Sequence, residues 1–523
     1  MPKGGSAPVG CVLAYAGETS ALKGWRVCDG TALQIKDHPH LHDVIGTIYG
    51  GDGVNSFAVP NYKGYFLRGL DPAGDVDKGA ENRTSPAGGR VTGPIVGSVQ
   101  NDYTARPTID PLKTNPPDSP FFTQTIDFPL SSNLASALTG GSETLGLDRG
   151  MTPNQFYSSG GGDAETRPIN VYVNFIIKTE PDAAMPTGAV IAFAGNKQIA
   201  SDNHGSYYKL CNGTQLDANE SRHTELLAAI GTAHGGDRST FNVPDYRGQF
   251  LRGANKGAGR DPEAAQRTAM ARGGAVGDAV GSVQEWTTRQ PRGDPFESDE
   301  VDLPSLATAR GWTGGWHTAA LPLQGLSVDF TQSGGNAETR PVNKYVDFYI
   351  LSQADPNETD IFPIGGIIGF AGSGSPSNDL WIQCRGQTCE KNLPRYKALY
   401  AAIQDDNGGS DAEFSLPNYD GYFLRGKDHG AGRDPDASLR GAAEKRGQTG
   451  DNVGSVQGYA TGKPKTPITG AVTLPNHVST AASLTRVYAW GVEKKLEILD
   501  GGDGETCPIN AGLFFYIRYY PNT

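Results

Sequence analysis

The sequence predicts an α+β protein built from three homologous domains. Two motifs support this prediction, because both recur in the same order with the same offsets of 184 and 173 residues. The first is Phe-Leu-Arg-Gly at 66–69, 250–253 and 423–426, and the second is Val-Gly-Ser-Val-Gln at 96–100, 280–284 and 453–457. Each copy is far longer than a solenoid unit and has the size of a domain. One helix among several short strands in each copy is typical of an α+β fold.

We place the domains at 1–180, 184–355 and 361–523. Each begins with an apolar run that ends in glycine, which predicts a buried strand. A second short strand follows and leads to a cysteine at the same place in each copy: Cys28, Cys211 and Cys384. Equivalent residues of separate domains are poorly placed to pair, so we expect these cysteines to be buried free thiols.

One helix is predicted in each domain, over 38–45, 223–230 and 396–403, from bulky residues at i, i+3, i+4 and i+7. Glycines and acidic residues end it, and the Phe-Leu-Arg-Gly strand comes next. An aspartate and an arginine then recur at a fixed separation, as Asp77 and Arg83, Asp261 and Arg267, and Asp434 and Arg440. A closing strand is expected at 171–177, 344–350 and 513–519.

The copies share almost no sequence in three inserts, at 101–163, 285–336 and 458–503, which we expect to be long loops. Two explanations are open. The inserts have diverged in sequence because these loops have no function, or they have diverged because each insert binds a partner. Scattered aromatic residues favour binding, since exposed aromatics are costly unless they contact something. The candidate partner-contacting residues are Phe121, Phe122, Phe156, Tyr157, Trp286, Trp312, Trp316, Tyr488 and Trp490.

The bulk properties exclude several classes of protein. A net charge of −12 and a pI near 5.3 argue against nucleic acid as a partner. No apolar run approaches the roughly 18 residues of a membrane span, so no membrane insertion is predicted. The sequence holds no phosphate-binding loop, nucleophile elbow, zinc-protease motif or dinucleotide fingerprint. We therefore expect neither an enzyme nor a cofactor.

The order of these motifs resembles the phage tail collar domain. The resemblance covers nearly all of each copy except the inserts, and its motifs in the first copy are at 8–17, 24–30, 41–53, 57–69, 96–100 and 164–170. It implies an intertwined trimeric fibre in which the insert forms a distal, partner-contacting head. Those fibres usually carry one collar in each chain, whereas this chain has three. We therefore predict an intramolecular pseudo-trimer, and stacked homotrimeric collars are the alternative.

Two sets of polar residues could suggest chemistry. Arg68, Arg252 and Arg425 recur with Glu165, Glu338 and Glu505. Their identical placement in every copy favours structural ion pairs or hydrogen bonds to the backbone over a catalytic cluster. The second set, His38, His40 and His42, resembles a metal ligand set, but at the i, i+4 pair the other copies have His223 with Leu227 and Tyr396 with Tyr400. We predict a helix surface there and no metal.

These observations predict a structural component of a phage tail or a phage-derived contractile particle. It would be a tail fibre, collar or baseplate adaptor that contacts other tail proteins through its inserts, located in the virion tail after assembly in the host cytoplasm. The alternative is a receptor-binding adhesin that recognises a host-surface glycan or protein. A tailspike depolymerase would need two carboxylates at glycosidase separation, which the sequence alone cannot pair.

Overall fold

The computed structural model describes residues 7–519 with gaps. The longer gaps are 18–21, 86–92, 106–111, 115–153, 196–206, 290–296, 302–315, 320–325, 335–338, 354–361, 463–467, 473–477 and 482–495, and others of one to three residues lie elsewhere.

The described residues are mostly strands, so the predicted α+β class with one main helix per domain is wrong. Helices α1 (Pro39–Ile45), α2 (Thr224–Ile230) and α3 (Pro394–Ile403) form where expected, but they have 7, 7 and 10 residues. The first two stop at Gly46 and Gly231, whose φ angles of 52° and 54° are unfavourable for other residues. The strands, in contrast, form a 17-stranded sheet and an eight-stranded sheet, together with smaller two-stranded sheets.

Each repeat contributes nearly the same series of strands to its body, with one fewer in repeat 1 among the described residues. Repeat 1 has β1 (Cys11–Tyr15), β2 (Trp25–Val27), β3 (Ala32–Gln34), β4 (Ser56–Ala58), β5 (Phe66–Gly69), β6 (Val99–Gln100) and β10 (Asn170–Lys178). Repeat 2 has β11 (Ala189–Phe193), β12 (Tyr208–Leu210), β13 (Gln215–Asp217), β14 (Thr240–Asn242), β15 (Phe250–Gly253), β16 (Thr268–Ala269), β17 (Ser282–Gln284) and β23 (Asn343–Leu351). Repeat 3 has β24 (Gly366–Phe370), β25 (Trp381–Gln383), β26 (Thr388–Glu390), β27 (Glu413–Ser415), β28 (Phe423–Gly426), β29 (Gly441–Ala442), β30 (Ser455–Gln457) and β35 (Asn510–Arg518).

Two triangles of strands relate the repeats around a common axis. In the first, β1, β11 and β24 pair with one another antiparallel at their ends. In the second, β5, β15 and β28 meet in the same way, through single residue pairs that join Arg252 to Phe66, Phe250 to Arg425, and Phe423 to Arg68. Because every repeat touches both others in each triangle, the body has pseudo-threefold symmetry.

The closing strands bind each repeat to the next one. The C-terminal part of β10 pairs with β1 and β2 of its own repeat, and its first four residues pair in parallel with β15 of repeat 2. Strand β23 makes the same pairing with β28, and β35 makes it with β5. The cycle therefore closes from repeat 3 back to repeat 1, and no repeat is a separate lobe.

The last glycine of each Phe-Leu-Arg-Gly strand permits this close approach. A Cβ atom at Gly69, Gly253 or Gly426 would overlap the backbone carbonyl of a tyrosine in a neighbouring repeat. The core beneath is one continuous apolar cluster that draws on all three repeats, including the three closing-strand residues Phe175, Phe348 and Phe515. The repeats thus share a core as well as a sheet.

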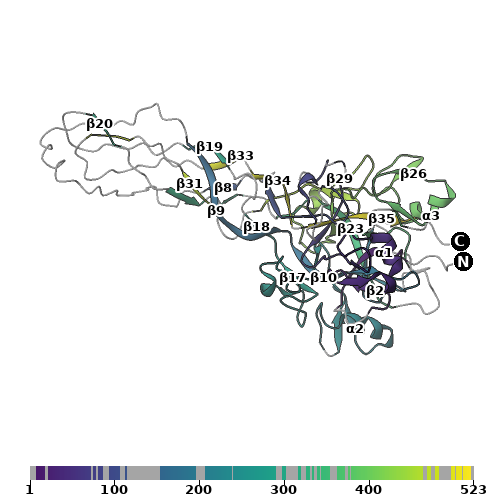
Figure 1. The fold of residues 1–523 in the computed structure, drawn as a ribbon. Coiled ribbons are helices and arrows are strands. Elements are labelled where there is room, and N and C mark those ends of the chain that lie inside the picture. The colour runs from purple at the N-terminus through teal and green to yellow at the C-terminus, as the bar shows by residue number, and fades with distance from the viewer. Residues whose placement is uncertain are drawn as a thin grey trace.

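The inserts form strands, so their prediction as loops is also wrong. Their strands are β7 (Tyr103–Ala105), β8 (Leu112–Thr114), β9 (Asn154–Arg167), β18 (Thr287–Arg289), β19 (Glu297–Val301), β20 (Trp316–Ala319), β21 (Leu326–Asp329), β22 (Ser333–Gly334), β31 (Ile468–Val472), β32 (Val478–Ala481), β33 (Leu496–Asp500) and β34 (Gly502–Cys507). The eight-stranded sheet combines strands from all three inserts, with β9 paired to both β19 and β31. These strands project away from the body that holds α1, α2 and α3 (Figure 1).

Candidate functional site at the pseudo-threefold axis

Three arginines lie at the centre of the second strand triangle. Arg68, Arg252 and Arg425 are fully buried and come from β5, β15 and β28. Each guanidinium lies 5.1 Å from the centre of a phenylalanine ring of a neighbouring repeat, the rings being Phe423, Phe66 and Phe250 respectively. Cation–π contacts of this kind are strongest where water is excluded.

Each of these arginines also binds the backbone of a neighbouring repeat. Arg252 Nε donates to the carbonyl of Gly64 at 3.0 Å, and Arg425 Nε donates to that of Gly248 at 2.8 Å. Arg68 Nε donates to Gly421 O at 2.8 Å, which completes the cycle. A buried carbonyl needs a donor, so the arginine side chain serves the interface directly.

An aspartate lies beside each of these arginines and balances its charge. Asp261 lies 3.3 Å from Arg252 and 3.2 Å from Arg267, and all three side chains are fully buried. The equivalent distances around Asp77 are 3.1 and 3.0 Å, and around Asp434 they are 3.2 and 3.1 Å. The fixed spacing of Asp77 and Arg83 was a signal for this pair. Glu165 and Glu505 lie on β9 and β34, where their side chains are not described, and Glu338 is outside the described residues.

An asparagine from the preceding repeat completes each network. Arg267 donates to Asn170 Oδ1 at 2.8 Å, Arg440 to Asn343 at 2.8 Å, and Arg83 to Asn510 at 2.8 Å. Each asparagine is the first residue of a closing strand, so the network fixes the point where that strand passes to the next repeat. The motif Val-Gly-Ser-Val-Gln supplies the remaining acceptors, Ser282 and Gln284 in repeat 2.

Burial and charge act in opposite directions on these groups. Burial raises the pKa of Asp261, but the charges of Arg252 and Arg267 and a hydrogen bond from Tyr172 outweigh it and hold that pKa below its usual value. Burial lowers the pKa of Arg267 to about 10, so it remains charged at neutral pH. The network is therefore a set of ionised groups, each of which would be costly to leave without its partner.

A ring of buried threonines joins the body to the inserts. Thr104, Thr288 and Thr461 begin the inserts, and they bond to Thr166, Thr339 and Thr506 at the insert ends. Thr461 Oγ1 also donates to Ala105 O at 2.6 Å, and Thr288 Oγ1 donates to Gly462 O at 2.9 Å. The Thr–Thr bonds lie within one repeat each, whereas these two bonds to carbonyls join repeat 3 to repeat 1 and repeat 2 to repeat 3, so they connect the three insert roots.

The predicted partner-contacting aromatics are not brought together on described surfaces. Trp286 is half-buried at the insert root, Phe156 and Tyr157 lie on β9 between β19 and β31, and Trp316 lies on β20. The side chains of these last three are not described. The remaining candidates, Phe121, Phe122, Trp312, Tyr488 and Trp490, lie outside the described residues.

Other polar groups have structural roles. His38 Nδ1 lies 3.2 Å from Glu180, and the His42 ring packs edge-on against Phe57. All six cysteines are free and buried, and burial raises the pKa of the Cys11 thiol to about 12. A thiol in such a place is inert. Among the described helices, none is long and apolar enough to cross a bilayer.

Comparisons with known proteins agree with this geometry. Three segments, 10–67, 188–251 and 365–424, match the model of the Phage Tail Collar Domain. Protein RhiB of Rhizobium leguminosarum bv. viciae is 31% identical over 159 residues, which are 30% of this chain and 64% of that protein. Short tail fiber protein gp12 of Enterobacteria phage T4 is 30% identical over 118 residues, which are 21% of this chain and 20% of that protein.

The chain contains three phage tail collar domains, one in each repeat, which confirms the resemblance seen in the motifs. The matched part spans less than two thirds of either relative.

Proposed function

We propose that this protein is an adaptor in a phage tail or a phage-derived contractile particle, with a rigid body that joins tail parts and inserts that contact a neighbouring protein. One observation carries the proposal: strands from all three inserts pair into shared sheets that extend from a cyclic body (Figure 1). A projection with a fixed root suits a connection between two larger parts.

The interactions at the axis support the adaptor role. The arginine networks and the threonine ring are buried and cross between repeats, so a force on the inserts is carried into the body through all three interfaces. Fully satisfied polar networks of this kind favour one rigid arrangement. The domain boundaries at 1–180, 184–355 and 361–523 remain our prediction within this arrangement.

The partners we propose are other tail proteins, with the protein located in the virion tail and assembled in the host cytoplasm. One relative comes from a phage and the other from a bacterium, so the proposal covers a phage-derived particle as well. Trp286, Phe156, Tyr157 and Trp316 are proposed contact residues because they lie on the insert strands or at their root.

Particle assembly tests this proposal. Deletion of the coding sequence should give particles that lack the tail parts beyond the adaptor, as seen by electron microscopy and mass spectrometry of purified particles. A complementing copy should restore them. Complete particles that contain every other tail protein would contradict the adaptor role.

A receptor-binding adhesin is the second candidate, because aromatic residues lie on the insert strands and sugars often stack on aromatic rings. Deletion would then leave complete particles that fail to adsorb to the host, and the purified protein would bind on a glycan array. Release of sugar fragments in the same assay would instead indicate a depolymerase.

A further inference from the structure

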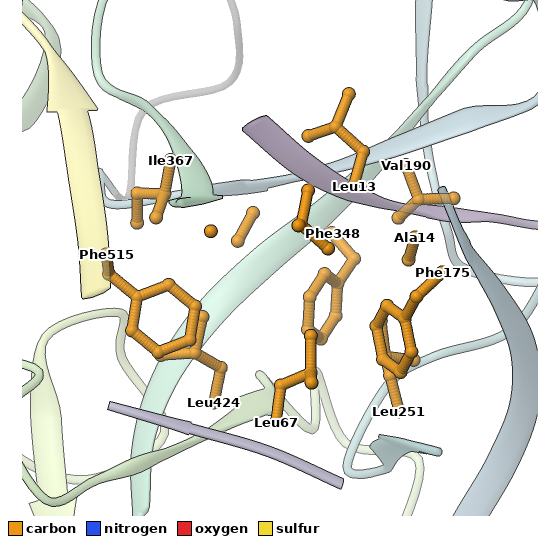
Figure 2. A pocket seen from close by; sticks show the side chains of 13 residues that line it. Leu13, Ala14, Leu67, Phe175, Val190, Leu251, Phe348, Ile367, Leu424 and Phe515 are labelled. Atoms are coloured by element: carbon orange, nitrogen blue, oxygen red, sulfur yellow. The ribbon is translucent and has the colours of Figure 1, made fainter. Parts of the chain in front are cut away.

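An apolar cavity of about 70 Å³ lies on the pseudo-threefold axis, between the two strand triangles. Equivalent residues of the three repeats surround it. Phe175, Phe348 and Phe515 come from the closing strands, and Leu67, Leu251 and Leu424 come from the Phe-Leu-Arg-Gly strands. Figure 2 shows these side chains grouped around the open space, with β1 residues on the opposite side.

The symmetry of the body explains why the cavity persists. Three equivalent strands approach the axis, and a large side chain on each of them would compete for the same space. The first strand triangle has small residues at the equivalent lining positions Ala14, Ala192 and Gly369. The leucines are partly accessible although they pack against the core, which agrees with an unfilled volume beside them.

The chemistry of the lining selects the kind of guest. Every side chain that lines the cavity is apolar, and the polar part of its surface comes from backbone atoms. A buried water needs two to four polar partners, and an engineered cavity of about 150 Å³ lined by apolar side chains stays dry and binds benzene or xenon. The axial cavity has roughly half that volume, so benzene is too large for it.

We propose that the axial cavity binds one small apolar molecule of the size of xenon or a short alkane. The site exists only when the three repeats have closed around the axis, because all three repeats supply residues that line it. A guest therefore binds the closed body and not the unfolded chain, and it should stabilise the closed body by mass action. The inference does not depend on the proposed tail function.

Xenon is the probe that tests the site in the full-length protein. Xenon NMR should show a saturable bound population, and the unfolding midpoint should rise with xenon pressure. The variant Ala192→Val adds volume at the wall, with a β-branched residue that suits a strand. It should lower xenon affinity at least tenfold. The control Leu439→Ala, at an exposed position, should leave binding unchanged.

A second variant keeps the test decisive if Ala192→Val does not fold. Leu251→Ala enlarges the cavity, and this variant should bind benzene, which the unaltered protein should not bind. No saturable xenon signal in the unaltered protein would overturn the proposal. Equal xenon binding by Ala192→Val and the unaltered protein would also overturn it, since the signal would then come from another place.

Discussion

The three interfaces between repeats share one core but differ at their edges. Short linkers join repeat 1 to repeat 2 and repeat 2 to repeat 3, whereas the interface between repeats 3 and 1 has no linker. At the linked interfaces, Arg167 lies 2.6 Å from Glu263, and Arg340 lies 2.8 Å from Asp436. The closing interface has Cys507 at the equivalent position of the arginine, and the sequence has Gly79 at that of the acid.

A second clamp differs in the same way. Arg260 donates to Lys63 O at 2.9 Å across the first linked interface, and Arg433 lies 3.0 Å from Asp245 across the second. The equivalent residue at the closing interface is Val76, next to Gly421. The buried arginine networks are thus present three times and the outer clamps twice. The central network is therefore the common requirement for closure, and the clamps are additions.

Removal of a central arginine should cost more stability than any other change considered below. Comparison of two such variants tests whether the central network is equally important at the linked and the closing interfaces. Arg252→Ala should lower the free energy of unfolding by about 3–5 kcal/mol, because it leaves the buried Asp261 with one arginine fewer. Arg68→Ala should cause the same loss at the closing interface. Urea denaturation measures both, with Arg222→Ala as an exposed control. A loss below about 1 kcal/mol for either variant would contradict a shared role.

Acid should weaken one interface more than the other two. Tyr49, His234 and Asn407 occupy one equivalent position, and each bonds to a carbonyl of a neighbouring repeat, Ala371, Ala16 and Ala194 respectively. Burial lowers the pKa of His234 from 6.5 to about 4. Its Nδ1 has no hydrogen-bond partner among the described residues.

As the pH falls, His234 therefore becomes protonated in the unfolded chain at a higher pH than in the folded protein. Stability contributed by neutral His234 is complete above pH 6.5 and declines as the pH falls from 6.5 towards 4, by up to about 3 kcal/mol. His234→Asn should remove most of this slope in denaturation curves taken across that range. His40→Asn, which alters an exposed histidine, should retain it. An unchanged slope in His234→Asn would place the acid sensitivity elsewhere.

A smaller loss of stability is expected when the residues of a linked interface are replaced by those at the equivalent positions of the closing interface. Arg340→Cys and Asp436→Gly, made singly and together, should give a coupling energy of about 1–2 kcal/mol, since the ion pair is largely shielded from water. The double variant should be more stable than the sum of the single losses predicts. Additive losses would show that the ion pair contributes little to stability. The presence of Cys507 in place of an arginine would then not make the closing interface weaker than the linked ones.

The smallest effect concerns the second clamp. Arg433→Val copies Val76 and should lower the unfolding free energy by about 1 kcal/mol, because the side chain is partly exposed and its ion pair is partly screened. Thermal unfolding of this variant beside Arg340→Cys should show the smaller loss for Arg433→Val. The reverse order would mean that the outer clamp matters more than the inner one.

Local features of this fold could be predicted from the sequence, but strand partners could not. The helices at 38–45, 223–230 and 396–403 follow from side-chain periodicity, which acts within one segment. Strand β10 pairs with β1 in its own repeat and with β15 in the next, and the same apolar pattern serves both partners. The inserts share little sequence, so their pairing into one sheet left no repeated signal.

The candidate site shows a similar limit. Arg68 is followed by two acids at recurrent positions, Asp77 and Glu165, and sequence separation does not reveal which one reaches the guanidinium. In the structure Asp77 contacts Arg68, and Gln100 and Arg83 gather around Asp77 at the start of a closing strand. The side chains of Glu165, Glu338 and Glu505 are not described, so the role predicted for these glutamates stays a prediction.

Cys507 has a further consequence for how such an axis can vary. It belongs to the same small cluster as Phe66, Phe250 and Phe423, where the three repeats meet. In a fibre of three identical chains, any substitution there would appear three times in one crowded space. In one continuous chain, a single repeat can change while the other two keep their packing. A residue that would be too large, too small or too polar at all three equivalent positions can therefore be accommodated at one of them.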